Sequence, residues 1–171
     1  MKKFALVSIA LIISVSAFSQ QRTQSVFGGD LAKDTPAQLN ELKLNLGTTI
    51  FGLFPEVSYE RILGEDFGVG ASAGISLNSD DYPLDFAFTP YARWYFGGSS
   101  TNLQKYGAGF FIEANGSVFS SGSTGAGLGL ALGWKYLTKN NWVGELYFGG
   151  GRDFVNDSGY PRMGITIGKR F

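Results

Sequence analysis

From Glu41 to Phe171, apolar and polar side chains alternate with a period of two. This period is typical of β-strands, because successive side chains of an extended chain point to opposite faces. No convincing 3.6-residue period of an amphipathic helix interrupts the pattern. We therefore predict eight strands: 41–51, 54–63, 67–77, 85–96, 107–119, 124–137, 142–154 and 160–171.

The polar face of these strands carries charges of both signs in the middle of the strands, among many small residues. Glycine accounts for 25 residues, and charged residues make up only 16% of the chain. A soluble barrel or sandwich would turn a denser set of lysines and glutamates toward water. A sparse polar face instead suits the cramped interior of a small barrel with an apolar exterior. We expect these residues to form ion pairs in that interior: Lys43, Glu56, Glu60, Arg93, Glu113, Lys135, Glu145, Arg162 and Arg170.

Aromatic side chains gather near the ends of the predicted strands. Aromatic belts on both sides of an apolar band are typical of transmembrane barrels. If the first strand runs outward from the periplasm, the periplasmic rim carries a membrane girdle of Trp94, Phe96, Trp134, Tyr136, Trp142 and Phe171. The outer rim is expected to carry Phe51, Phe54, Tyr82, Phe119, Phe154 and Tyr160. The predicted fold is all-β, an eight-stranded antiparallel up-and-down transmembrane β-barrel.

The parity of the polar positions predicts how neighbouring strands are joined. Polar positions change from odd to even between the first two strands, so their loop has an even length, and 52–53 fits a two-residue turn. The sixth and seventh strands both turn odd positions inward, so their loop is odd, 139–141. This register places Lys135 opposite Glu145 in the interior, and we expect the two side chains to form an ion pair.

The first 40 residues do not share the alternation. Lys2 and Lys3 precede an uncharged apolar run, 4–15, and small residues follow it at positions suited to cleavage after Ser19. This is the pattern of a secretory signal peptide, and the run is shorter than the ~20 apolar residues of a membrane-spanning helix. We expect residues 1–19 to be a signal peptide, 20–40 a flexible N-terminal segment, and 41–171 the transmembrane β-barrel.

Composition excludes several classes of function. The chain has no cysteine, no histidine and a formal net charge of zero. Disulfides, thiolate or imidazole metal ligands and Ser-His-Asp catalysis are therefore excluded, and nucleic acid would call for a basic excess. Glycines at 68–74 and 125–129 lie within alternating strands, which disfavours a nucleotide site. The acidic stretch 78–81 fits a solvated turn better than a Ca²⁺ site. We expect no enzyme, no catalytic residue, no metal and no cofactor.

Several short segments resemble those of small bacterial outer-membrane barrels. They are Leu42–Asn45, Val57–Arg61, Pro90–Phe96 and the C-terminal Gly168–Phe171. Over about residues 41–171 the chain resembles barrels of the OmpA/OmpX/OmpW kind, and more closely the uncharacterised small barrel proteins common in Bacteroidetes. The resemblance implies that the barrel-assembly machinery reads the terminal aromatic residue during insertion. Lys169 departs from the pattern, because such families usually have an aromatic or apolar residue there.

The sequence thus predicts an integral protein of the bacterial outer membrane with a structural, surface or minor binding role. Its expected partners are outer-membrane lipid and, during insertion, the barrel-assembly machinery; we expect no nucleic acid and a monomer. One alternative is a barrel that binds or passes a small apolar or amphipathic molecule, suggested by the inward-pointing rings of Tyr91, Tyr95, Phe111 and Tyr147. A soluble periplasmic β-barrel is a second alternative, and cell fractionation separates it from the others.

Overall fold

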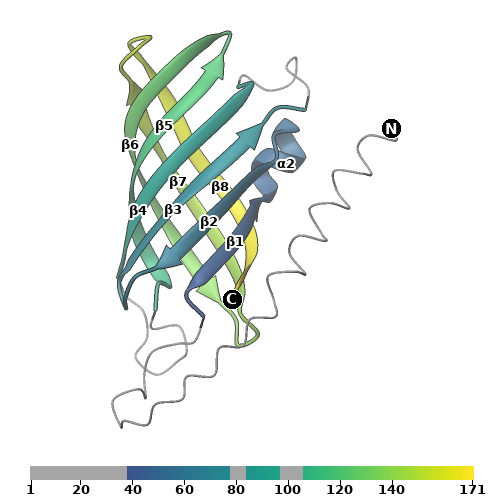
Figure 1. Ribbon diagram of the computed structural model, residues 1–171, viewed down its shortest axis with the longest axis vertical. Helices are drawn as coiled ribbons and strands as arrows, with labels where there is room; N and C mark the ends of the chain where they lie inside the picture. The colour runs from purple at the N-terminus through teal and green to yellow at the C-terminus, as the bar shows by residue number, and fades with distance from the viewer. Residues whose placement is uncertain (1–37, 78–83, 97–105) are drawn as a thin grey trace, which may run out of the picture. The chain divides into compact units, whose positions relative to one another are not determined.

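The computed structural model describes residues 38–77, 84–96 and 106–171. These residues form one closed antiparallel barrel (Figure 1). The predicted signal peptide, most of the predicted segment 20–40, Tyr82 and the acidic stretch 78–81 lie outside the described residues. No helix among the described residues is both long enough and apolar enough to cross a lipid bilayer.

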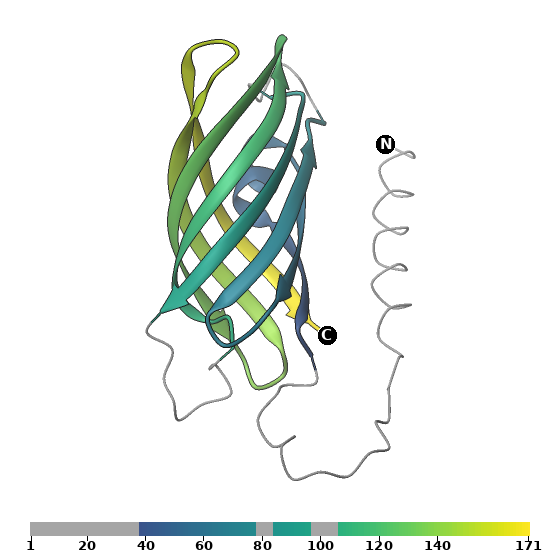
Figure 2. The ribbon, with the colours of Figure 1, turned by 60° about the vertical axis from the view of Figure 1, so that its left-hand side comes forward.

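Eight strands follow one another around the barrel in chain order, and the last pairs with the first. They are β1 (Asn40–Asn45), β2 (Glu56–Ile62), β3 (Phe67–Ile75), β4 (Phe86–Phe96), β5 (Gly109–Ser121), β6 (Ser123–Leu137), β7 (Trp142–Asp153) and β8 (Ser158–Arg170). Every neighbouring pair is antiparallel, and the strands are steeply inclined (Figure 2). This confirms the predicted all-β, eight-stranded up-and-down barrel. We call the end where β1 begins and β8 ends the C-terminal rim, and the opposite end the loop rim.

The loop between β6 and β7 follows the predicted parity. The Thr138 N–H donates to the Trp142 carbonyl over 2.9 Å, which leaves 139–141 as the loop. Asn141 takes a left-handed conformation, with φ of 61°, as the last residue of a three-residue hairpin loop commonly does. Lys135 and Glu145 are paired across the two strands, in the expected register.

The first predicted strand, 41–51, is wrong in its second half. β1 ends at Asn45, and the chain continues as the short helix α2 (Leu46–Gly52). Asn45 caps this helix, because its Oδ1 accepts a hydrogen bond from the Thr48 N–H at 3.4 Å. Leu53 then ends it in the left-handed region, with φ of 47°. The predicted two-residue turn at 52–53 is therefore also wrong: local capping outweighs the strand preference of the Thr-Thr-Ile-Phe run.

Because β1 is short, part of β8 has no strand on one side. β8 pairs with β7 along most of its length, but with β1 only from Thr166 to Arg170. The Asn45 side chain covers the first exposed groups of this edge: Oδ1 accepts from the Ile165 N–H, and Nδ2 donates to the Met163 carbonyl, both at 3.3 Å. We call the break beside residues 158–165, next to α2, the β1–β8 seam.

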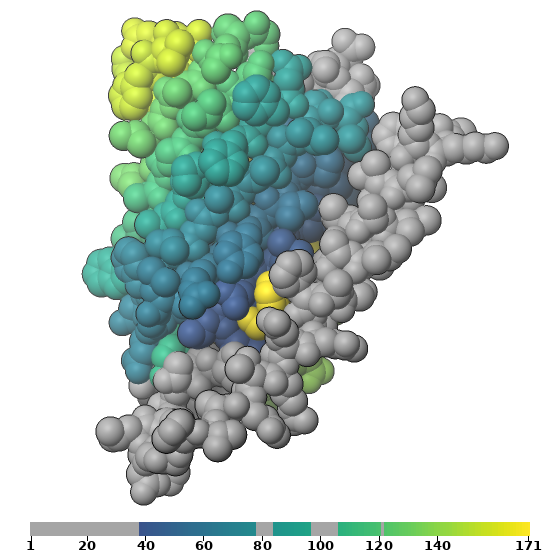
Figure 3. Space-filling model, in the orientation of Figure 1, coloured from purple at the N-terminus to yellow at the C-terminus, as the bar shows by residue number. Residues whose placement is uncertain are grey.

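The barrel is apolar outside and charged inside. Among the described residues, 28 large apolar side chains are exposed, and Leu130 at 64% and Phe148 at 67% are typical of them. Figure 3 shows one face of this outer surface, which the side chains of β2, β3 and β4 cover. On β6 and β7, exposed apolar residues alternate with inward Lys135 and Glu145. The charged side chains of the polar face therefore point into the barrel and are buried.

Aromatic rings fill the interior toward the C-terminal rim. Ile62, Tyr95, Phe111 and Tyr147 form one buried cluster. Inward glycines make room for these rings: a Cβ placed on Gly164 would lie 2.6 Å from the Tyr147 hydroxyl oxygen. Among the described residues, the C-terminal half of the barrel is therefore packed with rings, as expected for eight strands.

Candidate functional site

Ten charged side chains meet inside the barrel in one continuous network. All nine predicted interior residues belong to it, and none of the ten is more than 8% exposed. The members are five carboxylates, Glu41, Glu56, Glu60, Glu113 and Glu145, and five cations, Lys43, Arg93, Lys135, Arg162 and Arg170. Their formal charges cancel, so the barrel encloses no net charge in this region.

The tenth member, Glu41, was not among the predicted candidates. It accepts from Arg170 Nη2 at 2.5 Å and from Lys135 Nζ at 2.8 Å, close to the C-terminal rim. The signal was present in the sequence, because Glu41 has the same parity as Lys43, two residues later. Glu41 stands at the first position of the predicted strand 41–51, whereas the candidates were mid-strand residues.

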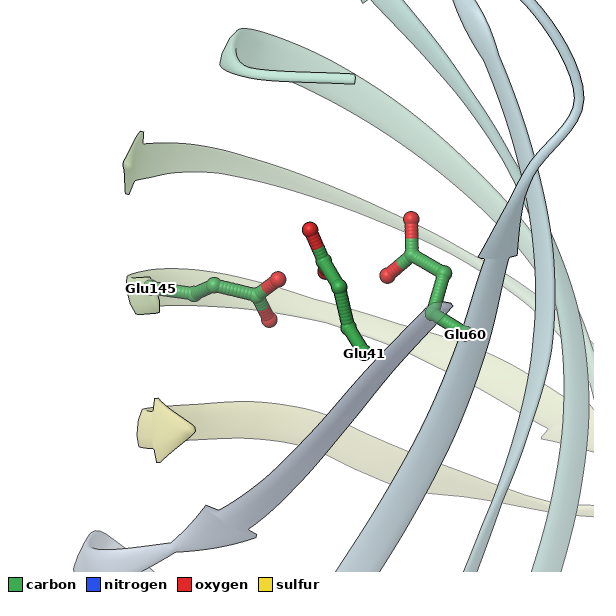
Figure 4. Close-up of side chains that lie close together, drawn as sticks. All are labelled: Glu41, Glu60 and Glu145. Atoms are coloured by element: carbon green, nitrogen blue, oxygen red, sulfur yellow. The ribbon is translucent and has the colours of Figure 1, made fainter. Parts of the chain in front are cut away.

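The centre of the network is formed by two ammonium groups among three carboxylates. Lys43 Nζ lies 2.7 Å from Glu145 and also bonds Glu60. Lys135 Nζ lies 3.0 Å from Glu60 and 3.2 Å from Glu145. Figure 4 shows Glu41, Glu60 and Glu145 pointing into the interior toward one another from β1, β2 and β7. The Lys135–Glu145 contact at the centre follows the register expected from parity.

Arg93 joins this centre to the next carboxylate along the barrel. Its guanidinium lies 2.8 Å from Glu60, 3.0 Å from Glu145 and 2.8 Å from Glu113. The same group stacks on two rings, 4.4 Å from the Tyr91 centroid and 4.3 Å from the Phe111 centroid. A planar guanidinium can bond several carboxylates along its edge while its flat face stacks on rings.

Arg162 carries the network toward the loop rim. It donates to Glu113 from Nε at 2.9 Å and to Glu56 from Nη1 at 2.7 Å. Glu56 also accepts from Asn45 Nδ2 at 2.8 Å, so both of its carboxylate oxygens accept hydrogen bonds. Toward the loop rim, the network therefore ends in the bonded Glu56–Arg162 pair.

Oxygens of Glu41, Glu60 and Glu145 lie within 4.8 Å of one another, close enough to share a metal ion. Two lysine ammonium groups and one guanidinium already occupy the space among them. Every buried side-chain nitrogen or oxygen in the described part of the chain has a hydrogen-bond partner. The carboxylates of this cluster are therefore held in ion pairs with the surrounding cations.

Beyond the Glu56–Arg162 pair, toward the loop rim, the barrel contains a cavity of about 390 Å³. Glu56, Arg162, Thr89 and Ser117 contribute polar groups to it. The rings of Phe54, Phe119 and Tyr160 and the apolar side chains of Leu84 and Met163 also line it. Two polar residues near the loop rim, Asp153 and Asn156, complete this part of the lining. The four predicted inward aromatics lie outside this lining and belong to the packed half.

The predicted outer girdle is partly wrong. Phe54 is 2% exposed and Phe119 is 8% exposed, and Tyr160 donates from its hydroxyl to Asn115 over 3.0 Å. Phe119 shares the inward parity of Glu113 on β5, and Phe54 lies over Gly74, where no side chain opposes it. These three rings therefore line the cavity. Phe51 and Phe154 are exposed, at 85% and 63%.

The predicted periplasmic girdle lies on the outside of the barrel. Trp94, Phe96, Trp134, Tyr136 and Trp142 are between 43% and 57% exposed, and Phe171 is half-buried. Trp94 contacts Phe96, and Trp134 contacts Tyr136, with ring centroids 6.1 and 6.0 Å apart. Lys169, which departs from the usual terminal pattern, places its ammonium 5.3 Å from the Trp142 ring centroid.

Comparisons of the chain with protein-family models, with curated proteins and with solved structures found no match.

Proposed function

We propose that this chain is an integral outer-membrane β-barrel protein with a structural or surface role. The observation that carries the proposal is the inverted distribution of the described side chains, with 28 large apolar groups exposed and the ten-residue ion-pair network buried inside. Soluble monomers rarely expose contiguous apolar patches above a few hundred Å². A lipid bilayer matches an apolar outer wall, and a closed barrel leaves few backbone groups unpaired within it.

The aromatic belt supports an orientation for the barrel. Trp94, Trp134 and Trp142 lie toward the C-terminal rim, and such rings favour the interface between lipid and water. With β1 entering from the periplasm, that rim faces the periplasm and the cavity faces the outer leaflet. The partners are then outer-membrane lipid and, during insertion, the barrel-assembly machinery. Phe171 is the terminal aromatic residue that this machinery would recognise. We expect a monomer, because the sheet closes on itself.

The same features favour a role that is neither enzymatic nor conducting. The chain has no histidine or cysteine, and the carboxylates of Glu60, Glu113 and Glu145 are held by cations. Rings and ion pairs fill the C-terminal half, so a solute would have to displace them in order to cross. Binding of a small molecule in the cavity is compatible with this arrangement, whereas passage through the barrel is disfavoured.

Fractionation of a Gram-negative host expressing the full chain tests the proposal. We expect the protein in the outer-membrane pellet, extracted only by detergent, with faster gel migration before boiling than after it. Phe171→Ala should lower the heat-modifiable fraction, while Phe154→Ala, at the other rim, serves as the matched control. Recovery of the folded protein in the soluble periplasm, without detergent, would overturn the proposal.

A further inference from the structure

We propose that the cavity of the outer half binds one small uncharged amphiphile, and that the amphiphile enters sideways through the β1–β8 seam. The lateral route rests on the proposed membrane location, because only then does the seam face lipid. The binding site itself depends only on the folded barrel. The two parts can therefore fail separately, and the experiments below are designed to keep them apart.

The size and lining of the cavity indicate the kind of ligand. A volume of about 390 Å³ lies near the lower end of the range for small-molecule sites. Phe54, Phe119 and Tyr160 offer ring faces to an apolar body. Thr89 and Ser117 contribute hydroxyls to the lining, and the two hydroxyls lie 2.6 Å apart. An apolar or aromatic molecule with one uncharged polar group, such as a hydroxyl, an arylamine or a carbonyl, matches both surfaces.

The charged groups of the lining argue against a charged ligand. Arg162 is held by Glu113 and Glu56, and Glu56 is also held by Asn45. Asp153, near the loop rim, accepts from the Asn156 amide at 2.7 Å and from two backbone N–H groups. Each charge therefore already has partners within the protein. An anion would find Arg162 already paired with two carboxylates, and a cation would find the Asp153 carboxylate already holding three hydrogen bonds. Either would lose its hydration for a group that already has partners, which is costly in a buried site.

The cavity lining continues through the barrel wall at the seam. Half of the six lining residues of β8 have the inward parity of the strand, but Gly159, Pro161 and Met163 have the outward parity and still line the cavity. Thr48 of α2 lines it from the other side of the seam. The cavity thus reaches the outer face between β8 and α2, where lipid chains would lie.

The backbone of β8 is adapted to an open seam. The Ile165 N–H and the Met163 carbonyl point across the seam to Asn45. By the period of two, the next residue with this orientation toward the loop rim is Pro161, which has no N–H to leave unpaired. With one donor fewer, this edge can meet an apolar molecule at less cost than an ordinary strand edge.

A matched pair of ligands and a matched pair of variants test the site. N-phenyl-1-naphthylamine is uncharged, and 8-anilinonaphthalene-1-sulfonate has the same rings with an added sulfonate. With the barrel in lipid nanodiscs, and empty discs as background, we expect saturable one-to-one binding of the first and at least ~10-fold weaker binding of the second. Ala87→Trp, which fills the cavity from β4, should reduce binding at least ~10-fold. Ala92→Trp, outward on the same strand, should retain it.

Heat-modifiable migration shows whether each variant is folded. If Ala87→Trp does not fold, Ser117→Leu gives a second, smaller filling of the same cavity, with the same expected loss. Equal binding by the wild type and by folded filled variants would overturn the site. Equal or tighter binding of the sulfonate would overturn the assignment of an uncharged ligand.

A disulfide across the seam tests the route. A Cβ placed on Gly47 would lie 3.9 Å from the Ile165 Cβ, within the range that a disulfide spans, and the chain has no other cysteine. In the oxidised Gly47→Cys/Ile165→Cys variant we expect the on-rate to fall at least ~10-fold, with recovery after reduction. An on-rate equal in the two redox forms would overturn the lateral route and assign entry to the loop rim.

Discussion

Replacing Arg93 with leucine tests whether the interior charges act as one network. Arg93 contacts Glu60, Glu113 and Glu145, and it is only 1% exposed. The substitution leaves five carboxylates facing four cations where water cannot compensate. Removing one partner of a buried ion pair costs about 3–5 kcal/mol. We therefore expect Arg93→Leu to lower the free energy of unfolding by about 3–5 kcal/mol.

A second substitution restores the charge balance. Arg93→Leu combined with Glu145→Gln leaves four carboxylates and four cations. If the charges are coupled, the double variant should be more stable than the sum of the two single effects predicts, by about 1–3 kcal/mol, within the range measured for directly interacting residues. Lys139→Leu, which removes an exposed loop charge, should change stability by no more than about 0.5 kcal/mol.

The assay is urea unfolding of the barrel in lipid vesicles, followed by tryptophan fluorescence. All four forms are measured in the same lipid, so that differences in insertion do not enter the cycle. Additivity of the two single effects within about 0.5 kcal/mol would refute the network, because independent sites behave in that way.

Three further predictions use matched positions. Leu130→Arg, in the middle of the outer wall at 64% exposure, should cost about 2–4 kcal/mol in vesicles, whereas Leu63→Arg at the C-terminal rim should cost about 0–1 kcal/mol; equal costs would contradict a bilayer around the wall. Gly133→Ala should cost about 1–3 kcal/mol by overpacking, because its Cβ would lie 2.7 Å from the Leu146 carbonyl oxygen. Gly144→Ala, with nothing within 4 Å, should be near neutral in the same unfolding assay. Asn45→Ala should cost about 1–3 kcal/mol by leaving buried partners unsatisfied, and amide exchange at Ile165 should accelerate; unchanged exchange there would show that Asn45 does not cover the seam.

Alternation was enough to predict the barrel, its strand order and most of the interior charges. The period of two fixes which side chains share a face, and parity then fixes whether a loop is odd or even. The Lys135–Glu145 register follows from this reasoning alone. Alternation also predicts that the rings of Phe111 and Tyr147 point into the barrel, where both are buried.

Alternation could not predict features set by single side chains in three dimensions. α2 depends on Asn45, which caps the helix and bonds the edge of β8 at the same time, and neither role leaves a periodic signal. Phe54 points inward because it follows the end of helix α2 and not a two-residue hairpin turn. From parity alone, Gly129→Ser is expected to disturb membrane insertion far less than Leu130→Arg, yet a Cβ at Gly129 would lie 2.7 Å from the Gly150 carbonyl oxygen. The space available at an inward glycine depends on its neighbours, which the pattern does not contain.

Fluorescence quenching in brominated lipids tests most directly whether the apolar wall faces acyl chains. All three tryptophans of the chain, Trp94, Trp134 and Trp142, lie on that wall near one rim and are about half exposed. In bilayers of the native chain we expect strong quenching by lipids brominated near the headgroup, weaker quenching by those brominated near the bilayer centre, and little by acrylamide in the water. Efficient quenching by acrylamide, with none by either brominated lipid, would contradict the account.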